Sequence, residues 1–239
     1  MEQNLSNLIR PMSVVAQEAI NYISGRREHS ITSLKTRWAK FNKQCMGGIE
    51  PNTVYTIAGI SGSGKSSMAN SISTDIVDLN PGEEIVILIF SLEMVGFRQV
   101  GRTLSSKLRK TTSTLYSSET DLDDDTFRKV ISVSNQLKEY PIWFVDNPTT
   151  PKEAEDIIRY FYNTYVKGTN KHFVIMYDHA LLTKPIGSVI ETMQELERVF
   201  ISAKKYPMTS VIQLAQMNRN IESPERINNF LSHYPMRSD

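Results

Sequence analysis

Five short runs of apolar residues recur along the chain, and each is bounded by polar or turn-forming residues. They cover residues 54–58, 85–90, 142–145, 173–177 and 210–215. Apolar runs of this length are typical of strands that are buried on both faces of a sheet. The segments between them are longer and repeat their apolar residues at helical spacing. Because strands and helices alternate, we predict an α/β fold with a mostly parallel central sheet and helices on both faces.

The predicted helices carry recognisable signals at their ends. They cover residues 66–79, 94–108, about 127–137, 151–167 and 190–205. Thr150 and Glu153 form a capping box around Pro151, a residue that suits the first turn of a helix. The acidic run 121–125 precedes another helix, where carboxylates favour the helix dipole. We therefore interpret that run as a helix start and not as a binding site.

The N-terminal segment differs from the rest of the chain. Residues 12–23 repeat apolar positions at helical spacing, and the sequence from Gly25 to Arg27 ends the pattern. A helix of this length forms no core alone, so it must pack on this domain or on a neighbouring chain. Residues 32–48 are basic and irregular. We therefore divide the chain into an appended helix, residues 1–30, and a main domain, residues 31–239.

A phosphate-binding loop follows the first predicted strand. Residues 59–66 fit the pattern G-x-x-x-x-G-K-[ST] at every fixed position, with a strand before it and a helix after it. Glycines let consecutive backbone N–H groups surround a phosphate, and the next helix directs its N-terminus at the same anion. The candidate nucleotide-binding residues are Gly59, Ser61, Gly62, Ser63, Gly64, Lys65, Ser66 and Ser67.

Two members of this loop have chemical roles of their own. We expect Lys65 to contact the β and γ phosphates and the Ser66 hydroxyl to bind Mg²⁺. The chain is thus predicted to bind a nucleoside triphosphate with Mg²⁺. Neither Asn-Lys pair, Asn42-Lys43 or Asn170-Lys171, continues into the guanine-reading pattern N-K-x-D, which disfavours a guanine-specific switch.

Carboxylates follow two of the other strands. In a doubly wound sheet, ligands bind beyond the carboxyl ends of the strands. Asp178 follows the fourth strand directly and is a candidate Mg²⁺ ligand, while Glu93 follows the second and is a candidate base for an attacking water. A strand-end acid can also be only a helix cap. Gln216 ends the fifth strand, where an amide can bind the γ phosphate, although a polar strand end needs no function.

Composition limits the remaining possibilities. The chain has 27 basic and 26 acidic residues, a net charge of +1, and 40% apolar residues, which excludes a polybasic tail and wholesale disorder. Cys45 is the single cysteine, so no intrachain disulfide forms, and the four histidines lie too far apart for a zinc motif. The longest apolar run, residues 85–90, is far shorter than a bilayer span, and the N-terminus does not resemble a signal peptide.

Taken together, the motifs resemble those of DnaB-type replicative DNA helicases. Residues 90–94 read F-S-L-E-M, a box found in that family, residues 174–178 resemble its Walker B strand, and residues 213–219 resemble its Q-x-N-R segment. The resemblance extends from about residue 31 to residue 239. It implies a RecA-like P-loop NTPase core that uses ATP and Mg²⁺, assembles as a hexameric ring and moves along single-stranded DNA. The cytoplasm of a bacterial cell or phage-infected host is the expected location.

The resemblance also implies roles for individual residues. Glu93 would be the catalytic base, Asp178 the Mg²⁺ aspartate, Gln216 the γ-phosphate sensor, and Arg102 a residue near the base and ribose of the nucleotide. Residues 12–23 would be the linker helix that docks on an adjacent subunit. A primase or a helicase loader would be a further partner.

DNA contacts are expected in the loops after the fourth and fifth strands, residues 183–189 and 220–236. Lys184, Arg219 and Arg226 are the candidate phosphate contacts there, although each can equally be an ordinary solvated cation.

The sequence departs from the family pattern in two places. His179-Ala180-Leu181-Leu182 follows Asp178, where the family usually has Y-L-Q-L. The chain ends at Asp239, where the family continues into sheet strands that carry an arginine finger. We therefore expect a C-terminally incomplete core, either a fragment or a minimal phage- or plasmid-encoded version, that binds ATP but hydrolyses it poorly alone.

Two alternatives stay open at this stage. One is another RecA-like ATPase of recombination or DNA repair, which would favour filaments over rings. The other is a nucleotide-binding assembly module without efficient hydrolysis.

Overall fold

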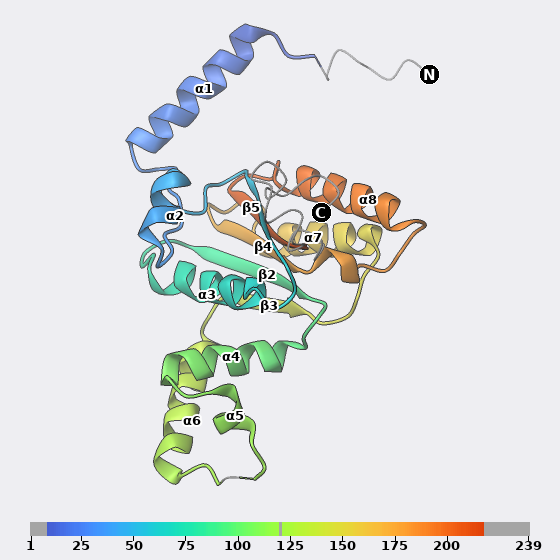
Figure 1. Cartoon of the computed structure of the whole chain (residues 1–239). Helices are drawn as coiled ribbons and strands as arrows, with labels where there is room; N and C mark the ends of the chain where they lie inside the picture. The colour runs from blue at the N-terminus through green and yellow to red at the C-terminus, as the bar shows by residue number, and fades with distance from the viewer. Residues whose placement is uncertain (1–8, 120, 218–239) are drawn as a thin grey trace, which may run out of the picture.

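The computed structural model describes residues 9–119 and 121–217, and its centre is a parallel sheet (Figure 1). The sheet order is β1-β5-β4-β2-β3, and every pairing in it is parallel. The strands are β1 (Val54–Gly59), β2 (Ile85–Ser91), β3 (Ile142–Val145), β4 (His172–Asp178) and β5 (Thr209–Gln216). All five strands were predicted from the apolar runs, and the parallel α/β architecture is confirmed.

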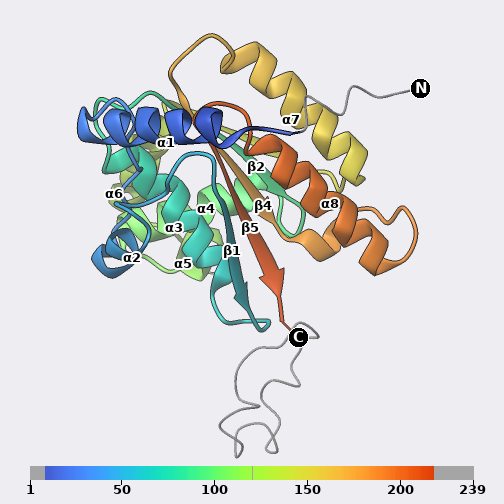
Figure 2. The ribbon, with the colours of Figure 1, turned by 90° about the horizontal axis from the view of Figure 1, so that it is seen from above.

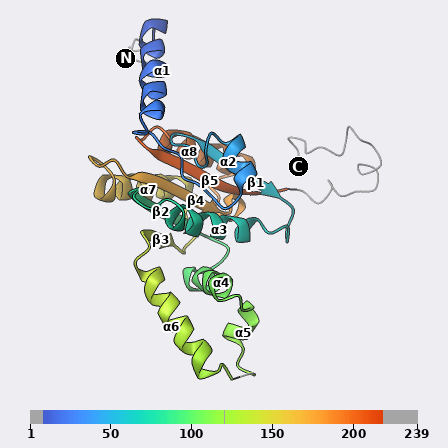
Figure 3. The ribbon, with the colours of Figure 1, turned by 90° about the vertical axis from the view of Figure 1, so that its left-hand side faces the viewer.

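Helices surround this sheet. They are α1 (Met12–Arg27), α2 (Ala39–Gln44), α3 (Lys65–Asp78), α4 (Gly96–Leu108), α5 (Thr112–Tyr116), α6 (Asp124–Lys138), α7 (Pro151–Tyr165) and α8 (Val189–Ala203), with a 3₁₀ turn η2 (Ala180–Leu182). Figures 1 and 3 show that α4, α5 and α6 project from one end of the molecule and α1 from the other. Both capping boxes at the starts of α7 and α8 are formed, the first being the predicted Thr150–Glu153 pair.

Two apolar layers cover the two faces of the sheet. Alternate residues of a strand point to opposite faces, so Phe90 and Tyr177 join one layer, while Ile89 and Met176 join the other. The first layer contains α7 and α8, and the second contains α3 together with Leu34 and Ile49 from the segment before β1. Strands β2 and β4 are buried along their whole length, as their uninterrupted apolar sequences predicted.

The N-terminal segment differs from the prediction. Helix α1 does not end at Gly25 but continues to Arg27, and Gly25 packs so closely on Ile31 that an added Cβ would lie 2.7 Å from its Cδ1. The segment 32–48, which we expected to be irregular, contains α2 and a bridge between Leu34 and Ile49. Most of the apolar side chains of α1 are exposed, for example Ile20 at 59% and Ile23 at 66%.

The start of α4 also differs. The expected helix from residue 94 begins at Gly96, because β2 ends at Ser91 and residues 92–95 form a turn instead. The carboxylate of Asp146 accepts a hydrogen bond from the Gly96 N–H at 2.9 Å, so a residue from the end of β3 caps the helix. Helix α5 and the turn η2 were not predicted, since each is too short to carry a periodic pattern.

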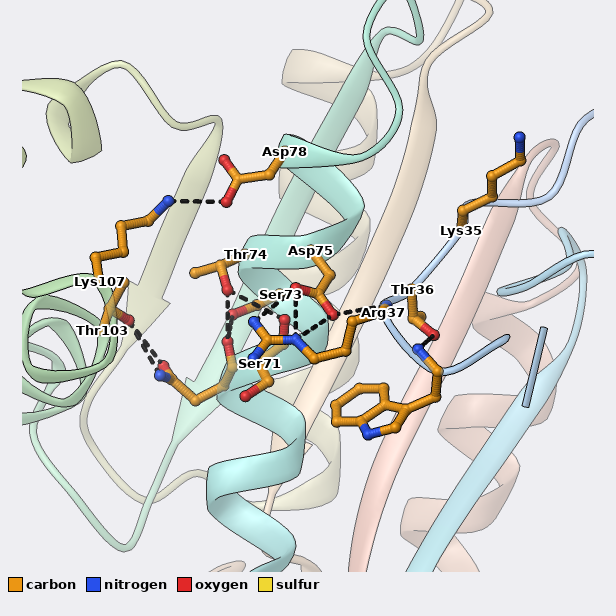
Figure 4. A network of polar contacts seen from close by, with 12 residues as sticks. Lys35, Thr36, Arg37, Ser71, Ser73, Thr74, Asp75, Asp78, Thr103 and Lys107 are labelled. Carbon is orange, nitrogen blue, oxygen red and sulfur yellow. Dashed lines mark hydrogen bonds and ion pairs between the residues drawn. The ribbon is translucent and has the colours of Figure 1, made fainter. Parts of the chain in front are cut away.

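Polar contacts hold α3 from two sides (Figure 4). On one side, Asp75 accepts hydrogen bonds from the backbone N–H of Arg37 at 2.9 Å and from its guanidinium Nη2 at 2.7 Å. The Asp75 side chain is only 6% exposed. On the other side, the Lys107 ammonium of α4 lies 2.8 Å from the carboxylate of Asp78, and Tyr140 donates to the same carboxylate. These contacts join α3 to the segment before β1 and to α4.

We predict that Asp75→Ala lowers the free energy of unfolding by about 1–3 kcal/mol, because it removes the buried carboxylate that accepts hydrogen bonds from the backbone N–H and the half-exposed guanidinium of Arg37. Urea denaturation followed by circular dichroism measures this. Asp125→Ala is the matched control, since its exposed pair with Lys129 contributes at most about 0.5 kcal/mol. Equal losses in the two variants would show that the Asp75 contact contributes no more than a surface pair.

Candidate nucleotide-binding and catalytic site

The phosphate-binding loop lies between the end of β1 and the first residue of α3. Gly62 and Gly64 have φ angles of +81° and +90°, a conformation that glycine adopts without strain. A Cβ on either would meet no atom within 4 Å, whereas one on Gly59 would lie 2.6 Å from the Ser63 hydroxyl. Lys65 donates from Nζ to the carbonyl of Ile60 at 2.8 Å. The loop therefore curls back on its lysine at the N-terminus of a 14-residue helix, where the backbone N–H groups favour an anion.

The sheet register brings the other candidate residues to this loop. Gly59 pairs with Gln216, and Ser91 pairs with Asp178. Figure 2 shows β1 and β5 side by side, with their C-terminal ends at the same edge. Since β5 lies between β1 and β4, Gln216 stands between the loop and the strand of Asp178. Glu93 follows Ser91 on the turn beyond β2.

A cleft of about 240 Å³ joins most of these residues. Its lining consists of Ser61, Gly62, Gly64, Lys65, Ser66, Ser67, Glu93, Arg102, His179 and Gln216. Gly59 and Ser63 do not line this cleft but lie against each other within the loop. Asp178 lies beside Ser66 on the wall of a small neighbouring cavity. The structure thus brings the predicted nucleotide-binding, metal-binding and catalytic residues together.

Asp178 is suited to hold a cation. It is only 7% exposed, and burial raises the pKa of its carboxyl above the ordinary value, an effect that the Ser66 hydroxyl partly offsets. Its Oδ1 atom is buried and has no hydrogen-bond partner among the described residues. A carboxylate beside a hydroxyl is an oxygen donor set, which is what Mg²⁺ prefers, and Mg²⁺ commonly needs only one or two carboxylates in addition to substrate phosphates. Residues 9–119 and 121–217 contain no group of three or more His, Cys, Asp or Glu side chains that could hold a metal ion.

His179 is a cleft residue whose place the sequence did not reveal. It was noted only as a departure from the family pattern, yet it lines the cleft with Glu93 and Arg102. It is 9% exposed, and its Nδ1 atom is buried without a hydrogen-bond partner in the described part of the chain. The peptide bond between Asp178 and His179 is cis. The one signal for His179 in the sequence was its position directly after the strand-end Asp178.

The candidate DNA contacts lie away from this cleft or outside the described residues. Lys184 follows η2, and its exposed ammonium is 4.0 Å from the carboxylate of Glu153. Its backbone N–H donates to the carbonyl of Thr149 at 2.8 Å, which fixes the chain at this point. Arg219, Arg226 and the loop 220–236 fall outside the described residues.

Comparison with protein families favours one of the interpretations left open by the sequence. The DnaB-like helicase C terminal domain family matches residues 33–239. The chain belongs to this family. Membership in the DnaB-like family makes the chain a replicative helicase motor domain of the ATP-hydrolysing kind, and it confirms the resemblance drawn from the F-S-L-E-M box and the Q-x-N-R segment.

Solved structures show the same fold at low sequence identity. One solved ATPase domain superposes with a TM-score of 0.73 at 18% identity, and the match covers 93% of this chain and 76% of that one. A DnaB-like replicative helicase, solved for its interactions with primase, gives a TM-score of 0.71 at 18% identity, and the match covers 93% of this chain. The present chain spans about half of that second protein, since the match covers 51% of it. No curated protein sequence is significantly similar to the chain.

The described helices give no sign of a membrane segment. Within residues 9–119 and 121–217, none is both long and apolar enough to cross a bilayer.

We predict that Lys65→Ala weakens the binding of ATP at least about tenfold, because a charge-assisted hydrogen bond to phosphate contributes about 1.5–3 kcal/mol. Titration with a fluorescent ATP analogue measures the Kd. Lys40→Ala, which removes an exposed lysine from α2, is the matched control and should leave the Kd unchanged. An unchanged Kd in Lys65→Ala would contradict the assignment of the site.

Proposed function

We propose that this chain is the ATPase motor of a replicative DNA helicase that couples ATP hydrolysis to movement along single-stranded DNA. One observation carries the proposal: the phosphate-binding loop, Glu93, Gln216 and Asp178 meet at one edge of the sheet in a chain of the DnaB-like helicase family. The proposal divides the chain into residues 1–30, which associate with a neighbouring subunit, and residues 31–239, the ATPase core.

The loop and the adjacent side chains bind the triphosphate. The backbone N–H groups of residues 61–66 and the positive end of α3 bind the phosphates, and Lys65 turns from the Ile60 carbonyl to the β and γ phosphate oxygens. Ser66 and Asp178 would hold Mg²⁺, which would supply positive charge that neutralises the phosphates. Arg102 reaches the cleft from α4 and contacts the base or ribose of the nucleotide.

Hydrolysis requires a base near the γ phosphate. Glu93 is exposed on the cleft wall opposite the loop, where its carboxylate orients a water and accepts its proton. Gln216 hydrogen-bonds the γ phosphate from the tip of β5. Because Gln216 is the last residue of its strand, the presence or loss of that phosphate is transmitted to the chain that follows β5.

Ring assembly gives the exposed helix α1 a partner. Its side chains Val14, Ile20 and Ile23 are 46–66% exposed, and in the ring this helix docks on the adjacent subunit. Hexamers expose the loops that follow β4 and β5 to DNA, where Lys184, Arg219 and Arg226 bind phosphates without sequence preference. Primase or a helicase loader is the proposed protein partner, by analogy with the similar helicase solved for its interactions with primase.

We predict that Glu93→Gln lowers the rate of ATP hydrolysis at least about 100-fold while ATP still binds, because the amide cannot accept the proton of the attacking water. Steady-state phosphate release gives the rate, and the fluorescent analogue gives the Kd. Glu195→Gln, on the exposed surface of α8, is the matched control. A normal rate in Glu93→Gln would remove this residue from the mechanism.

We further predict that the rate of ATP hydrolysis per chain rises with protein concentration and with added single-stranded DNA, because an intersubunit site is completed only in the ring. Lys65→Ala provides the blank. Turnover no greater than the blank at every concentration, in a protein that still binds ATP, would favour a nucleotide-binding assembly module instead.

A further inference from the structure

The backbone that carries Glu93 is a turn between β2 and α4. Ser91, the last residue of β2, pairs with Asp178 at the end of β4, and the N–H of Leu92 donates to the Asp178 carbonyl at 2.8 Å. The far end of the turn is fixed by the Asp146 cap on the N–H of Gly96. Glu93 is exposed, and the turn sets the direction in which its side chain leaves the backbone.

A side-chain relay closes this turn. The Ser91 hydroxyl donates to the carbonyl of Met94, and the Gln99 side chain of α4 donates from Nε2 to the Ser91 Oγ at 2.7 Å. A hydroxyl can donate only one hydrogen bond, and the Ser91 hydroxyl donates it to the Met94 carbonyl. Ser91 can therefore only accept from Gln99, so the relay requires a donor at position 99.

Gln99 lies outside the nucleotide cleft. It is 8% exposed and lines the small cavity that Ser66 and Asp178 share, behind the loop. A buried amide is costly unless it is hydrogen-bonded. No feature of the phosphate-binding loop or of the F-S-L-E-M box requires a glutamine five residues beyond that box, in the first turn of α4.

We propose that Gln99 is a positioning residue: through the Ser91 hydroxyl it fixes the turn of residues 92–95 and thereby the direction of the Glu93 carboxylate. The inference rests on the proposed function of Glu93. A displacement of about 1 Å in a reacting group can lower a rate about 100-fold, so a single buried amide at this place affects hydrolysis without contacting the nucleotide.

Two variants of Gln99 distinguish the effect of its hydrogen-bond donor from the effect of its side-chain size. Gln99→Met keeps the length but removes the donor, and it should lower kcat about 10- to 100-fold. Gln99→Glu replaces the donor with an acceptor that competes with the Met94 carbonyl for the Ser91 proton, so it should lower kcat at least as far. In Gln99→Met, the Kd for the ATP analogue should stay within about twofold of the wild-type value, since the cleft lining is unchanged.

Thr103→Val is the matched control. Thr103 lies one turn further along the same helix and is also buried. Its hydroxyl accepts a hydrogen bond from Asn70 of α3 at 3.0 Å and donates to the backbone carbonyl of Gln99 at 3.4 Å, so it contacts neither the Gln99 amide group nor the turn. Its loss should leave kcat within about twofold, as expected of a contact that stabilises helix packing only.

A double-mutant cycle with Glu93→Gln tests whether Gln99 acts through the base. In the Glu93→Gln background, Gln99→Met should cause no further loss, because the group that it positions is already gone. An equal additional loss in that background, or a wild-type kcat in the single variant, would overturn the proposal.

Amide hydrogen exchange gives a readout that does not depend on turnover. Exchange in a peptide covering residues 91–96 should be faster in Gln99→Met than in wild type or Thr103→Val. Unchanged exchange there would overturn the relay even if the protein hydrolyses ATP. Faster exchange in a protein whose Glu93→Gln variant keeps a normal rate would support the relay and refute the proposed role of Glu93.

Discussion

Parallel, in-register pairing of β1, β5, β4 and β2 is the constraint on which the rest of this molecule depends. It aligns the carboxyl ends of four strands that lie far apart in sequence, so Gly59 meets Gln216 and Ser91 meets Asp178. A shift of one residue in any pair would turn an apolar set to the wrong face. The two buried layers therefore stabilise the fold and set the geometry of the cleft at the same time.

Helix α3 links this sheet to the surrounding elements, and it also carries the loop. Its N-terminus is directed at the phosphate site, while Asp75 and Asp78 in its last turn bind Arg37 and Lys107 from opposite sides. The contacts at one end of the helix thus fix the direction of the other end. Because Lys107 belongs to α4, which also carries the cleft residue Arg102, α3 is connected to both the loop and the Arg102 side of the cleft.

The sequence patterns predicted those features that interactions between neighbouring residues determine. The five strands, the capping box at Thr150 and the loop at residues 59–66 were found because each depends on neighbouring residues alone. The later start of α4 was missed, since its cap is Asp146, 50 residues away. The continuation of α1 through Gly25 depends on a contact with Ile31, and the placement of His179 and Gln99 around the site depends on the packed strand ends. No periodicity encodes such contacts.

Two buried polar groups beside the cleft, Asp178 and His179, lower the stability of the fold, a cost that ligand binding in the proposed function would offset. Burying a carboxylate without full pairing disfavours its charged form, and Asp178 and His179 each keep one buried polar atom without a partner among the described residues. Other polar groups at the same edge of the sheet have hydrogen-bond partners, namely the Ser91 hydroxyl and the Leu92 N–H. The two side-chain atoms without a partner, Asp178 Oδ1 and His179 Nδ1, thus belong to residues that line cavities with Ser66. A cation and a triphosphate, as bound in the proposed function, would supply the missing partners there and offset the cost of burying these groups.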